Sequence, residues 1–408
     1  MRIHKKKVRK IITYGVAGML LFLTGCGQPE AVTVTVTDTA EMQFLPERFV
    51  IPTQEQLLEE YLETMTLEEK VGQLFYVTMG NLSQPSLETS NSGLTVTDAE
   101  IATIQKFQPG GVILMGGNIQ SDAQVQELTA ALQQNSRTPM FIGVDEEGGI
   151  VSRLGSAEGI SMGNVGTMQS IGATGDEAKA YETGATLAND LSALGFNMDF
   201  APVADVLTNP NNYEIGSRSF GSDSNQVSTM VASEICGLQE NGVSAVTKHF
   251  PGHGGVIGNS HENLQYVDTT LDVLRQQEFQ PFQSAIEVKT DAILVSHLVL
   301  RSVDAENPST LSESVVTGLL REELGYDGVI MTDSFQMGSI TENYGQSEAA
   351  VTSIQAGCDM ILMPMEYEAC YQGVLQAVQD GRISEEQINA SCMRILRAKA
   401  ERGILILE

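Results

Sequence analysis

Short apolar runs alternate with amphipathic stretches along most of the chain. From residue 52 onward the amphipathic stretches carry apolar residues at a spacing near 3.6, which predicts helices, and the runs between them are rich in Val, Ile, Leu and Phe, which predicts strands. The predicted strands are 74–79, 111–115, 140–145, 196–200, 244–249, 292–297, 328–333 and 359–363. The predicted helices include 176–194, 225–239, 271–289, 313–323 and 347–356.

These repeats indicate the fold class. Apolar strands separated by helices are typical of a parallel sheet that is covered on its outer face, and eight such strands predict closure into a (β/α)₈ barrel of the TIM type, an α/β fold. We expect one such domain over residues 51–408. The alternative fold is an open, doubly wound sheet.

Polar residues at strand ends indicate where a functional site lies. Asp145, Lys248, His249, His297 and Asp333 each stand at the carboxyl end of a predicted strand. In a barrel these ends share one rim, where enzymes of this fold assemble their sites from several strands. One charged strand end is unremarkable, whereas five predict a site.

The first 25 residues have the form of an export signal. A basic segment, MRIHKKKVRK, precedes an uncharged apolar run that is short for a membrane span. The run ends in Leu23-Thr24-Gly25-Cys26, which resembles the lipobox of bacterial lipoproteins. We therefore expect a signal peptide at 1–25, a lipid on Cys26 and a flexible tether at 26–50. An ordinary signal peptide and an uncleaved anchor are the alternatives, and all three place the remaining chain outside the cytoplasm.

Charge and composition narrow the classes of partner. Removal of residues 1–25 takes away six positive and no negative charges, so the net charge changes from −29 to −35. Such a surface disfavours nucleic acids and polyanions. The chain is 42% hydrophobic in spaced runs, which favours a packed core over disorder. Because Trp is absent, only Tyr and Phe can stack on a ligand, which favours a small pocket over a long cleft. We expect a monomer that needs no cofactor.

Cysteine and histidine give no metal motif. The cysteines beyond position 26 have a spacing typical of neither a disulfide-dense scaffold nor a zinc site, so we expect free thiols at Cys236, Cys358, Cys370 and Cys392. Three of the four histidines outside the leader fall within the Gly-rich segment KHFPGHGGVIGNSHENL at 248–264, which favours a functional loop. Metal binding is a competing interpretation, but no partner residue has ligand spacing such as H-E-x-x-H, so we expect no metal.

This segment also resembles a family signature. Residues 248–254, KHFPGHG, followed by Ser260-His261, are similar to the K-H-F-P-G-H-G…D-S-H signature of glycoside hydrolase family 3, in its N-acetyl-β-glucosaminidase branch. The resemblance covers about residues 55–400. Other segments that agree with it are TMTLEEKVGQLF (64–75), GVDEEGGIVSRL (143–154), APVADV (201–206), GSRSFG (216–221), NPSTLS (307–312) and GYDGVIMTDSFQM (325–337).

The resemblance implies two catalytic groups. Cleavage of a glycosidic bond with retention needs a carboxylate that attacks the anomeric carbon and a proton donor for the leaving oxygen. Asp333, at the end of GVIMTD, matches the family's nucleophile, and the alternative role of helix N-cap suits Ser334 better. His261 matches the histidine that serves this branch as general acid/base, and an imidazole, with an ordinary pKa of ~6.5, exchanges protons around neutrality.

One position departs from the family pattern. The branch holds its acid/base histidine with an Asp two residues earlier, where this chain has Asn259. An Asn carbonyl can still orient the ring of His261, but it offers no negative charge to the imidazolium. In the serine-protease triad the comparable change costs about four orders of magnitude in rate. Glu262 is an alternative partner, although adjacent side chains rarely face one another.

Further residues are implied as binders of the terminal sugar. By position, Asp145, Arg153, Arg218, Lys248 and His249 correspond to groups that hydrogen-bond its hydroxyls and its acetamido group. For Arg153 and Arg218 the alternative is a structural ion pair with nearby acids. Gly148 and Gly149 are expected to let the backbone approach the ligand, and His253 and His297 to support the loop.

The expected function is that of a lipid-anchored, retaining exo-β-N-acetylglucosaminidase acting on muropeptides or chitooligosaccharides outside the cytoplasm. A β-glucosidase or β-xylosidase of the same family is the alternative enzyme, and phosphate in place of water as the acceptor stays open. The alternative from another class is a sugar-binding lipoprotein that has lost catalysis, which Asn259 permits.

Overall fold

The computed structural model describes residues 52–86, 93–258, 260 and 262–407. The chain divides into two units, Met1–Ile51 and Pro52–Glu408, and every described residue belongs to the second. The expected signal peptide, the lipidated Cys26 and the tether lie outside the described residues, as do Asn259 and His261. These expectations therefore remain predictions.

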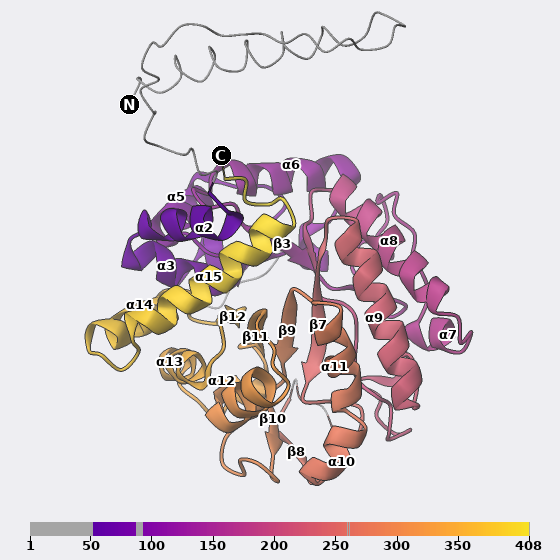
Figure 1. Cartoon of the computed structure of the whole chain (residues 1–408). Coiled ribbons are helices and arrows are strands. Elements are labelled where there is room, and N and C mark those ends of the chain that lie inside the picture. Colours follow the sequence, from indigo (N-terminus) through magenta and orange to yellow (C-terminus); the bar gives the residue numbers. More distant parts are fainter. Residues whose placement is uncertain (1–51, 87–92, 259, 261, 408) are drawn as a thin grey trace, which may run out of the picture. The chain divides into compact units, whose positions relative to one another are not determined.

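Eight parallel strands form a closed barrel in the middle of the second unit (Figure 1). They are β1 (Phe75–Thr78), β2 (Gly111–Ile113), β3 (Phe141–Val144), β6 (Met198–Asp199), β7 (Ser244–Phe250), β9 (Ala292–Val295), β11 (Val329–Ser334) and β12 (Met360–Leu362). Neighbours pair in the order β1-β12-β11-β9-β7-β6-β3-β2, and β2 closes onto β1. Each predicted run overlaps one of these strands, so the (β/α)₈ prediction is confirmed and the open sheet is excluded.

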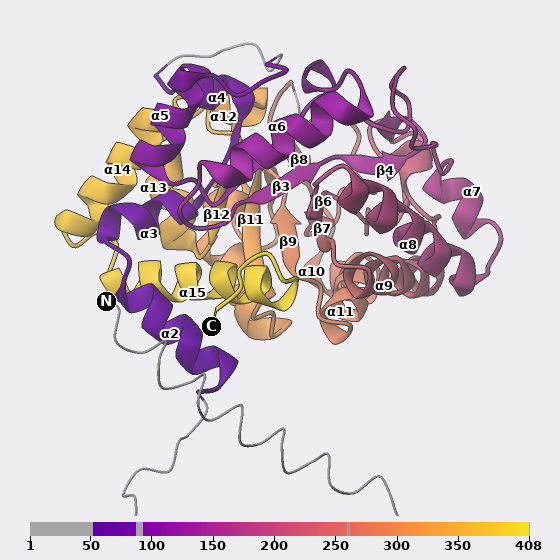
Figure 2. The same ribbon diagram turned by 90° about the horizontal axis from the view of Figure 1, so that it is seen from above.

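Helices surround the barrel (Figures 1 and 2). The α-helices are α2 (Gln54–Glu63), α3 (Leu67–Gln73), α4 (Met79–Ser83), α5 (Asp98–Phe107), α6 (Asp122–Gln134), α7 (Met168–Gly172), α8 (Glu177–Ala193), α9 (Ser224–Glu240), α10 (Leu271–Gln276), α11 (Phe279–Glu287), α12 (Gly338–Thr341), α13 (Gln346–Ala356), α14 (Tyr367–Gln379) and α15 (Glu385–Glu401). The tighter or wider turns are η2 (Gly116–Asn118), η3 (Gly216–Arg218), η4 (Ser309–Leu311) and the π-helical η5 (Ser314–Glu323).

Two small sheets stand apart from the barrel. The hairpin β4 (Glu146–Gly148) and β5 (Val151–Ser152) is antiparallel, and β8 (Gln265–Val267) pairs in parallel with β10 (Leu298–Leu300). Near the two ends of the described chain, α2 lies beside α15, and Leu58 joins Leu396 in an apolar cluster (Figure 2). This cluster ties the first described helix to the last.

The barrel interior is filled by side chains rather than open. The Tyr76 ring meets Phe200 edge to face with centroids 5.3 Å apart, and both side chains are buried. A Cβ on Gly143 would lie 2.3 Å from the Tyr76 hydroxyl oxygen, so only glycine fits beside this ring. Tyr76 therefore supports Phe200, which lines a cavity at one end of the barrel.

The predicted helix at 271–289 is two helices in the structure. It breaks between α10 and α11, where Gln277 has φ −124° and ψ −77°. A continuous helix would require a backbone N–H at Pro281, which proline lacks, whereas the first turn of a new helix tolerates it. The break turns Glu278 inward, where it is buried.

The cysteines at 236, 358, 370 and 392 are free thiols, as expected. All are buried except Cys236, which is partly exposed. Among the described helices, none combines the length and apolar character that crossing a membrane would require.

Candidate active site

A cavity of about 330 Å³ opens at the carboxyl ends of the barrel strands. Asp145 directly follows β3, Lys248 and His249 lie in β7, and Asp333 lies in β11, so three strands deliver polar groups to one place. The described site residues predicted from the sequence all line this cavity: Asp145, Arg153, Arg218, Lys248, His249 and Asp333. The structure thus brings them together, while Asn259 and His261 lie outside the described residues.

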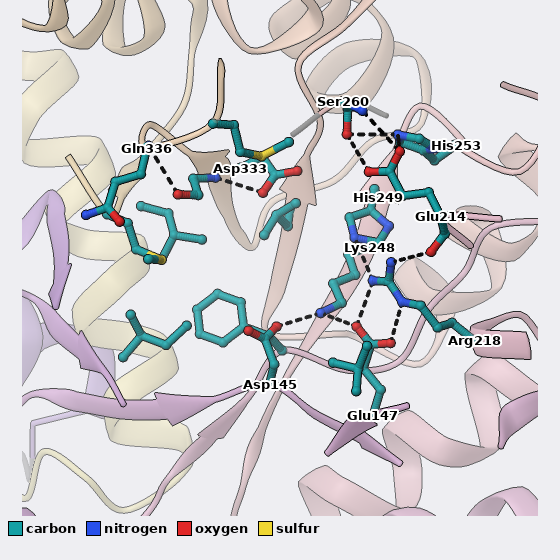
Figure 3. Close-up of a pocket in the computed structure, with 18 of the residues that line it drawn as sticks. Asp145, Glu147, Glu214, Arg218, Lys248, His249, His253, Ser260, Asp333 and Gln336 are labelled. Carbon is teal, nitrogen blue, oxygen red and sulfur yellow. Dashed lines mark hydrogen bonds and ion pairs between the residues drawn. The ribbon is translucent and has the colours of Figure 1, made fainter. Parts of the chain in front are cut away.

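Lys248 stands between two carboxylates (Figure 3). Its Nζ donates to Asp145 Oδ1 at 2.8 Å and to Glu147 Oε1 at 2.6 Å. Burial alone would lower the pKa of Lys248, but the two carboxylates outweigh it and raise the pKa. Lys248 is therefore a fixed cation. Asp145 lines the cavity with a side chain that is 21% exposed, and its Oδ2 lies 3.9 Å from Arg153 Nη2.

Glu147 is the buried centre of this network, and the sequence did not single it out. It accepts from Lys248 and, through both oxygens, from Arg218 Nε and Nη2 at 2.7 and 2.8 Å. Burial would raise the pKa of its carboxyl, but Lys248 and Arg218 outweigh burial and hold the pKa at about 2. Glu147 is therefore ionised at every working pH. Arg218 forms the structural ion pair that the sequence analysis gave as its alternative role, and it also lines the cavity.

His249 is oriented by a second residue missed from the sequence, Asp205. Nδ1 of His249 lies 2.6 Å from Asp205 Oδ2, and Nε2 lies 3.3 Å from Arg218 Nη2. Because guanidinium only donates, Nε2 is the acceptor and Nδ1–H donates to Asp205. Burial would raise the pKa of the Asp205 carboxyl, but His249 outweighs it and the pKa is lowered. The segment APVADV resembles the family pattern, but nothing in the sequence indicated that its Asp205 would contact His249.

Asp333 is held at the end of β11. Its Oδ1 accepts the backbone N–H of Ser334 at 2.7 Å. Buried His297 lies behind it, with Nε2 3.0 Å from the Ser334 carbonyl oxygen and Nδ1 2.7 Å from Thr310 Oγ1. Since a carbonyl only accepts, His297 donates through Nε2 and accepts at Nδ1. His297 was expected to support the Gly-rich loop. In the structure it instead contacts the end of β11, next to Asp333.

A third residue missed from the sequence, Glu214, precedes η3 and contacts the loop after β7. It accepts from Ser260 Oγ at 2.6 Å and from Ser260 N at 3.1 Å, and it lies 3.6 Å from His253 Nε2. Figure 3 shows these three residues together at one side of the cavity. Glu214 was not predicted from the sequence, and Glu262, which was considered there, is exposed.

Gly148 and Gly149 lie in the β4–β5 hairpin, where the backbone requires glycine. Their φ angles are +81° and +57°. A Cβ on Gly148 would lie 2.5 Å from the Gly166 carbonyl oxygen, and one on Gly149 would lie 2.8 Å from Thr167 Cγ2. Neither is among the residues that line the cavity, and the expected approach of the backbone to a ligand stays a prediction.

The chemistry of this cavity suits a polyhydroxylated ligand. Fixed cations donate and carboxylates accept around one small space, and a carboxylate stands at a strand end. Within the described ranges, no group of three or more His, Cys, Asp or Glu side chains is placed to hold a metal ion.

Known proteins are similar to this chain in sequence and in fold. Residues 66–398 match the family model described as the N-terminal domain of glycosyl hydrolase family 3. A β-hexosaminidase of Shewanella frigidimarina is 36% identical over 67% of this chain and 80% of its own. β-Hexosaminidase A of Pseudoalteromonas piscicida is 32% identical over 79% of this chain and 58% of its own.

The solved structures include a family 3 β-N-acetylglucosaminidase from Paenibacillus sp. strain FPU-7. It is 38% identical with a TM-score of 0.77, over 83% of this chain and 63% of its own. The chain thus spans less than two thirds of this protein and of the Pseudoalteromonas relative.

Proposed function

The chain belongs to glycosyl hydrolase family 3, and from this membership we propose that it is a retaining exo-β-N-acetylglucosaminidase. It would remove terminal N-acetyl-β-D-glucosamine from cell-wall-derived saccharides. One observation carries the proposal: Asp333 and the predicted sugar-binding residues, which come from distant parts of the sequence, line a single cavity. The names of the relatives, β-hexosaminidase and β-N-acetylglucosaminidase, support the choice of sugar.

In the proposed mechanism Asp333 is the nucleophile. Its carboxylate attacks the anomeric carbon while the bond to the leaving oxygen breaks, and His261 donates a proton to that oxygen. The product is a glycosyl ester of Asp333. Neutral His261 then takes a proton from water, whose oxygen attacks the same carbon and releases both the sugar and the Asp333 carboxylate. Two inversions give net retention.

The other cavity groups bind the sugar. Asp145 accepts hydroxyl protons, and Lys248 and Arg153 donate to sugar oxygens. Nε2 of His249 is an acceptor, fixed by the Nδ1–H bond to Asp205. Because Asp145, Lys248 and His249 are held by protein partners before substrate arrives, these side chains need little ordering on binding.

We also propose that the mature protein is attached to the membrane by a lipid on Cys26 and acts outside the cytoplasm as a monomer. This rests on the basic and apolar leader and on the segment LTGC at 23–26. Its test is argued in the Discussion.

The function is tested with three 4-nitrophenyl β-glycosides, of N-acetylglucosamine, glucose and xylose. We expect hydrolysis of the first to dominate, with the β-anomer released first. A slow 5-fluoro glycoside of N-acetylglucosamine should label Asp333, as located by mass spectrometry. No hydrolysis of any glycoside would favour the sugar-binding protein, and a label on another residue would exclude Asp333. A rate increase with added phosphate, together with a glycosyl phosphate product, would identify phosphorolysis.

A further inference from the structure

The junction between β3 and the β4–β5 hairpin sets where two cavity carboxylates lie. β3 ends at Val144 and β4 begins at Glu146, so Asp145 is the single residue between them. Asp145 lines the cavity, and so does Glu147, the second residue of β4. A shift of this junction would therefore move both of the acids that bind Lys248.

A side chain of the neighbouring strand β6 holds this junction. Asp199 Oδ1 accepts the backbone N–H of Glu146 at 3.0 Å. That N–H belongs to the planar peptide unit that joins Asp145 to Glu146, so the bond fixes the main chain directly after the Asp145 Cα. Beside it, the Phe200 N–H donates to the Val144 carbonyl oxygen at 3.0 Å. The two bonds fasten the end of β3 to β6 on either side of Asp145.

The surroundings of Asp199 suit an uncharged acid. Its side chain is fully buried, and Oδ2 has no hydrogen-bond partner among the described residues. Lys248, whose charge reaches Asp199, already donates to Asp145 and Glu147 at 2.8 and 2.6 Å. A buried carboxylate without a cation of its own is strongly disfavoured, so such a group keeps its proton.

On balance, the groups around Asp199 also favour its protonated form. Burial is the main cause that raises the pKa of Asp199 well above its usual value, and the carboxyl groups of Glu146 in β4 and Glu234 in α9 add to it. The Glu146 N–H and Lys248 in β7 lower the pKa but are outweighed. A further titratable neighbour, Tyr76 in β1, is itself uncharged, because burial raises its pKa well above the usual value.

An uncharged acid also leaves the ion pairs of the cavity wall balanced. Lys248 and Arg218 are the two cations of this network, and Asp145 and Glu147 are the two anions that contact them. A third buried carboxylate would compete for Lys248 and would leave one negative charge without a partner.

The same pair of strands shows that an amide can make this kind of bond. Asn197, two residues before Asp199, accepts the Ile142 N–H through Oδ1 at 2.7 Å near the amino end of β3. Asn197 is not among the residues that line the cavity. One side chain near each end of the β3–β6 pair thus accepts a backbone N–H, and the one at the amino end is uncharged.

We propose that Asp199 is a positioning residue for sugar binding and acts as an uncharged acid: it holds the junction that presents Asp145 to the terminal sugar. The inference rests on the proposed function. Asp199 is not among the residues that line the cavity, so it acts through the main chain at Glu146 and not on the sugar itself. Its role requires the acceptor oxygen and does not require a negative charge.

Two substitutions separate the hydrogen bond from the charge. Asp199→Asn removes the titratable group but keeps an oxygen for the Glu146 N–H. Asp199→Leu has a similar size but no acceptor, and it leaves a buried N–H without this bond. The matched control is Asn197→Leu, which removes the corresponding acceptor near the amino end of the same strand pair. Asp199→Ala takes the place of Asp199→Leu if that variant does not fold.

The readouts are kcat and KM on 4-nitrophenyl N-acetyl-β-D-glucosaminide and the inhibition constant Ki of free N-acetylglucosamine. We expect Asp199→Leu to raise KM and Ki at least about tenfold while kcat changes less, because Asp145 binds the sugar before the reaction as well as in the transition state. Asp199→Asn should keep both constants within about twofold of the wild type. Asn197→Leu should leave both unchanged. Thermal unfolding establishes that each variant is folded.

An increase in KM as large in Asp199→Asn as in Asp199→Leu would show that the negative charge is needed and would overturn the uncharged acid. Unchanged constants in a folded Asp199→Leu protein, or equal increases in Asp199→Leu and Asn197→Leu, would overturn the positioning role. A wild-type protein that hydrolyses no glycoside would instead overturn the proposed function. Calorimetric binding of N-acetylglucosamine to the same variants would then still test Asp199.

Discussion

Arg218 and Glu147 form a two-point ion pair in the wall of the cavity, with Nε to Oε2 at 2.7 Å and Nη2 to Oε1 at 2.8 Å. Nη1 donates to the Glu214 carbonyl oxygen and Nη2 also faces His249, so most of the five guanidinium donors are used within the protein. Arg218 therefore acts on the sugar chiefly by holding its neighbours.

Replacement of Glu147 by Gln should test this arrangement. The variant leaves Arg218 and Lys248 close together without a shared anion, so we expect KM to rise at least about tenfold, and breaking a buried pair should lower the free energy of unfolding by about 3 kcal/mol. The matched control is Asp291→Asn, which breaks the two-point pair between Asp291 and Arg402 just before β9. It should lose similar stability in urea unfolding while KM is unchanged. If KM rose in both variants, the higher KM of Glu147→Gln would be explained by lost stability and not by the arrangement of the cavity.

Asp333→Asn should abolish turnover without unfolding the protein. The Asn Oδ1 can still accept the Ser334 N–H, so the strand end keeps its bond, but an amide is a poor nucleophile. We expect kcat to fall at least about 10³-fold on an aryl glycoside, with an unchanged melting temperature. Asp327→Asn, at an exposed carboxylate beside Arg394, serves as the control. A near wild-type rate for Asp333→Asn would remove this residue from the nucleophile role.

The sequence predicts the barrel because each strand and each helix carries its own local pattern. It predicts the rim residues because the carboxyl ends of parallel strands meet. The site residues that the sequence analysis missed are placed by the direction of their side chains, and a local sequence pattern does not give that direction. In Asp145-Glu146-Glu147, the first residue faces the cavity, the second accepts Ser152 and backbone N–H groups of its own hairpin, and the third turns to Lys248 and Arg218.

Contacts between loops were likewise out of reach of the sequence. Asp205 and Glu214 follow β6, and they contact residues of the loop after β7 that lie 48 and 46 positions later in the chain. From the sequence alone, each of these residues would be interpreted as a solvent-exposed acidic residue in a loop. The parallel pairing of β6 with β7 brings these two loops together.

The stability of the fold should depend on a buried acid, Glu234 in α9. Both of its carboxyl oxygens are buried without a hydrogen-bond partner among the described residues, and burial, together with the charge of Glu147, raises its pKa from 4.5 to about 8. Between these two pH values the folded chain keeps a proton that the unfolded chain has released. Stability therefore falls as pH rises through this window, by up to about 1.4 kcal/mol per pH unit for this group.

Glu234→Gln should remove that dependence. At pH 5, where the wild-type carboxyl is largely protonated in the folded state, the two melting temperatures should be similar. At pH 8 the variant should melt higher by about 2 °C or more, because no carboxylate has to be buried. Glu348→Gln, at an exposed side chain, should leave the pH dependence unchanged. Parallel curves for wild type and Glu234→Gln would show that the carboxylate finds stabilisation in the folded state.

Lipid attachment is tested by Cys26→Ser. Without a thiol there is nothing to acylate, so the protein should appear unprocessed or released, whereas the wild type partitions with membranes. Fractionation, followed by mass spectrometry of the N-terminus, measures both outcomes. Cys236→Ser, at a partly exposed thiol of α9, is the control and should remain with the membrane. A correctly cleaved Cys26→Ser protein that still partitions with membranes would contradict the anchor.

The last prediction concerns Asn259→Asp in the otherwise wild-type chain. A carboxylate two residues before His261 should stabilise its imidazolium and raise the pKa of His261, so the acid stays protonated to higher pH. The alkaline limb of the pH profile should then move upward. The rate on a disaccharide should rise more than that on an activated aryl glycoside, because only the disaccharide depends strongly on protonation of its leaving group.

The comparison of the two substrates decides what Asn259 means for catalysis. A larger gain on the disaccharide than on the aryl glycoside would show that the amide at 259 limits protonation of the leaving group. A neutral or harmful effect of Asn259→Asp on both substrates would mean that another residue already fills the role of the carboxylate, or that His261 works without a carboxylate partner.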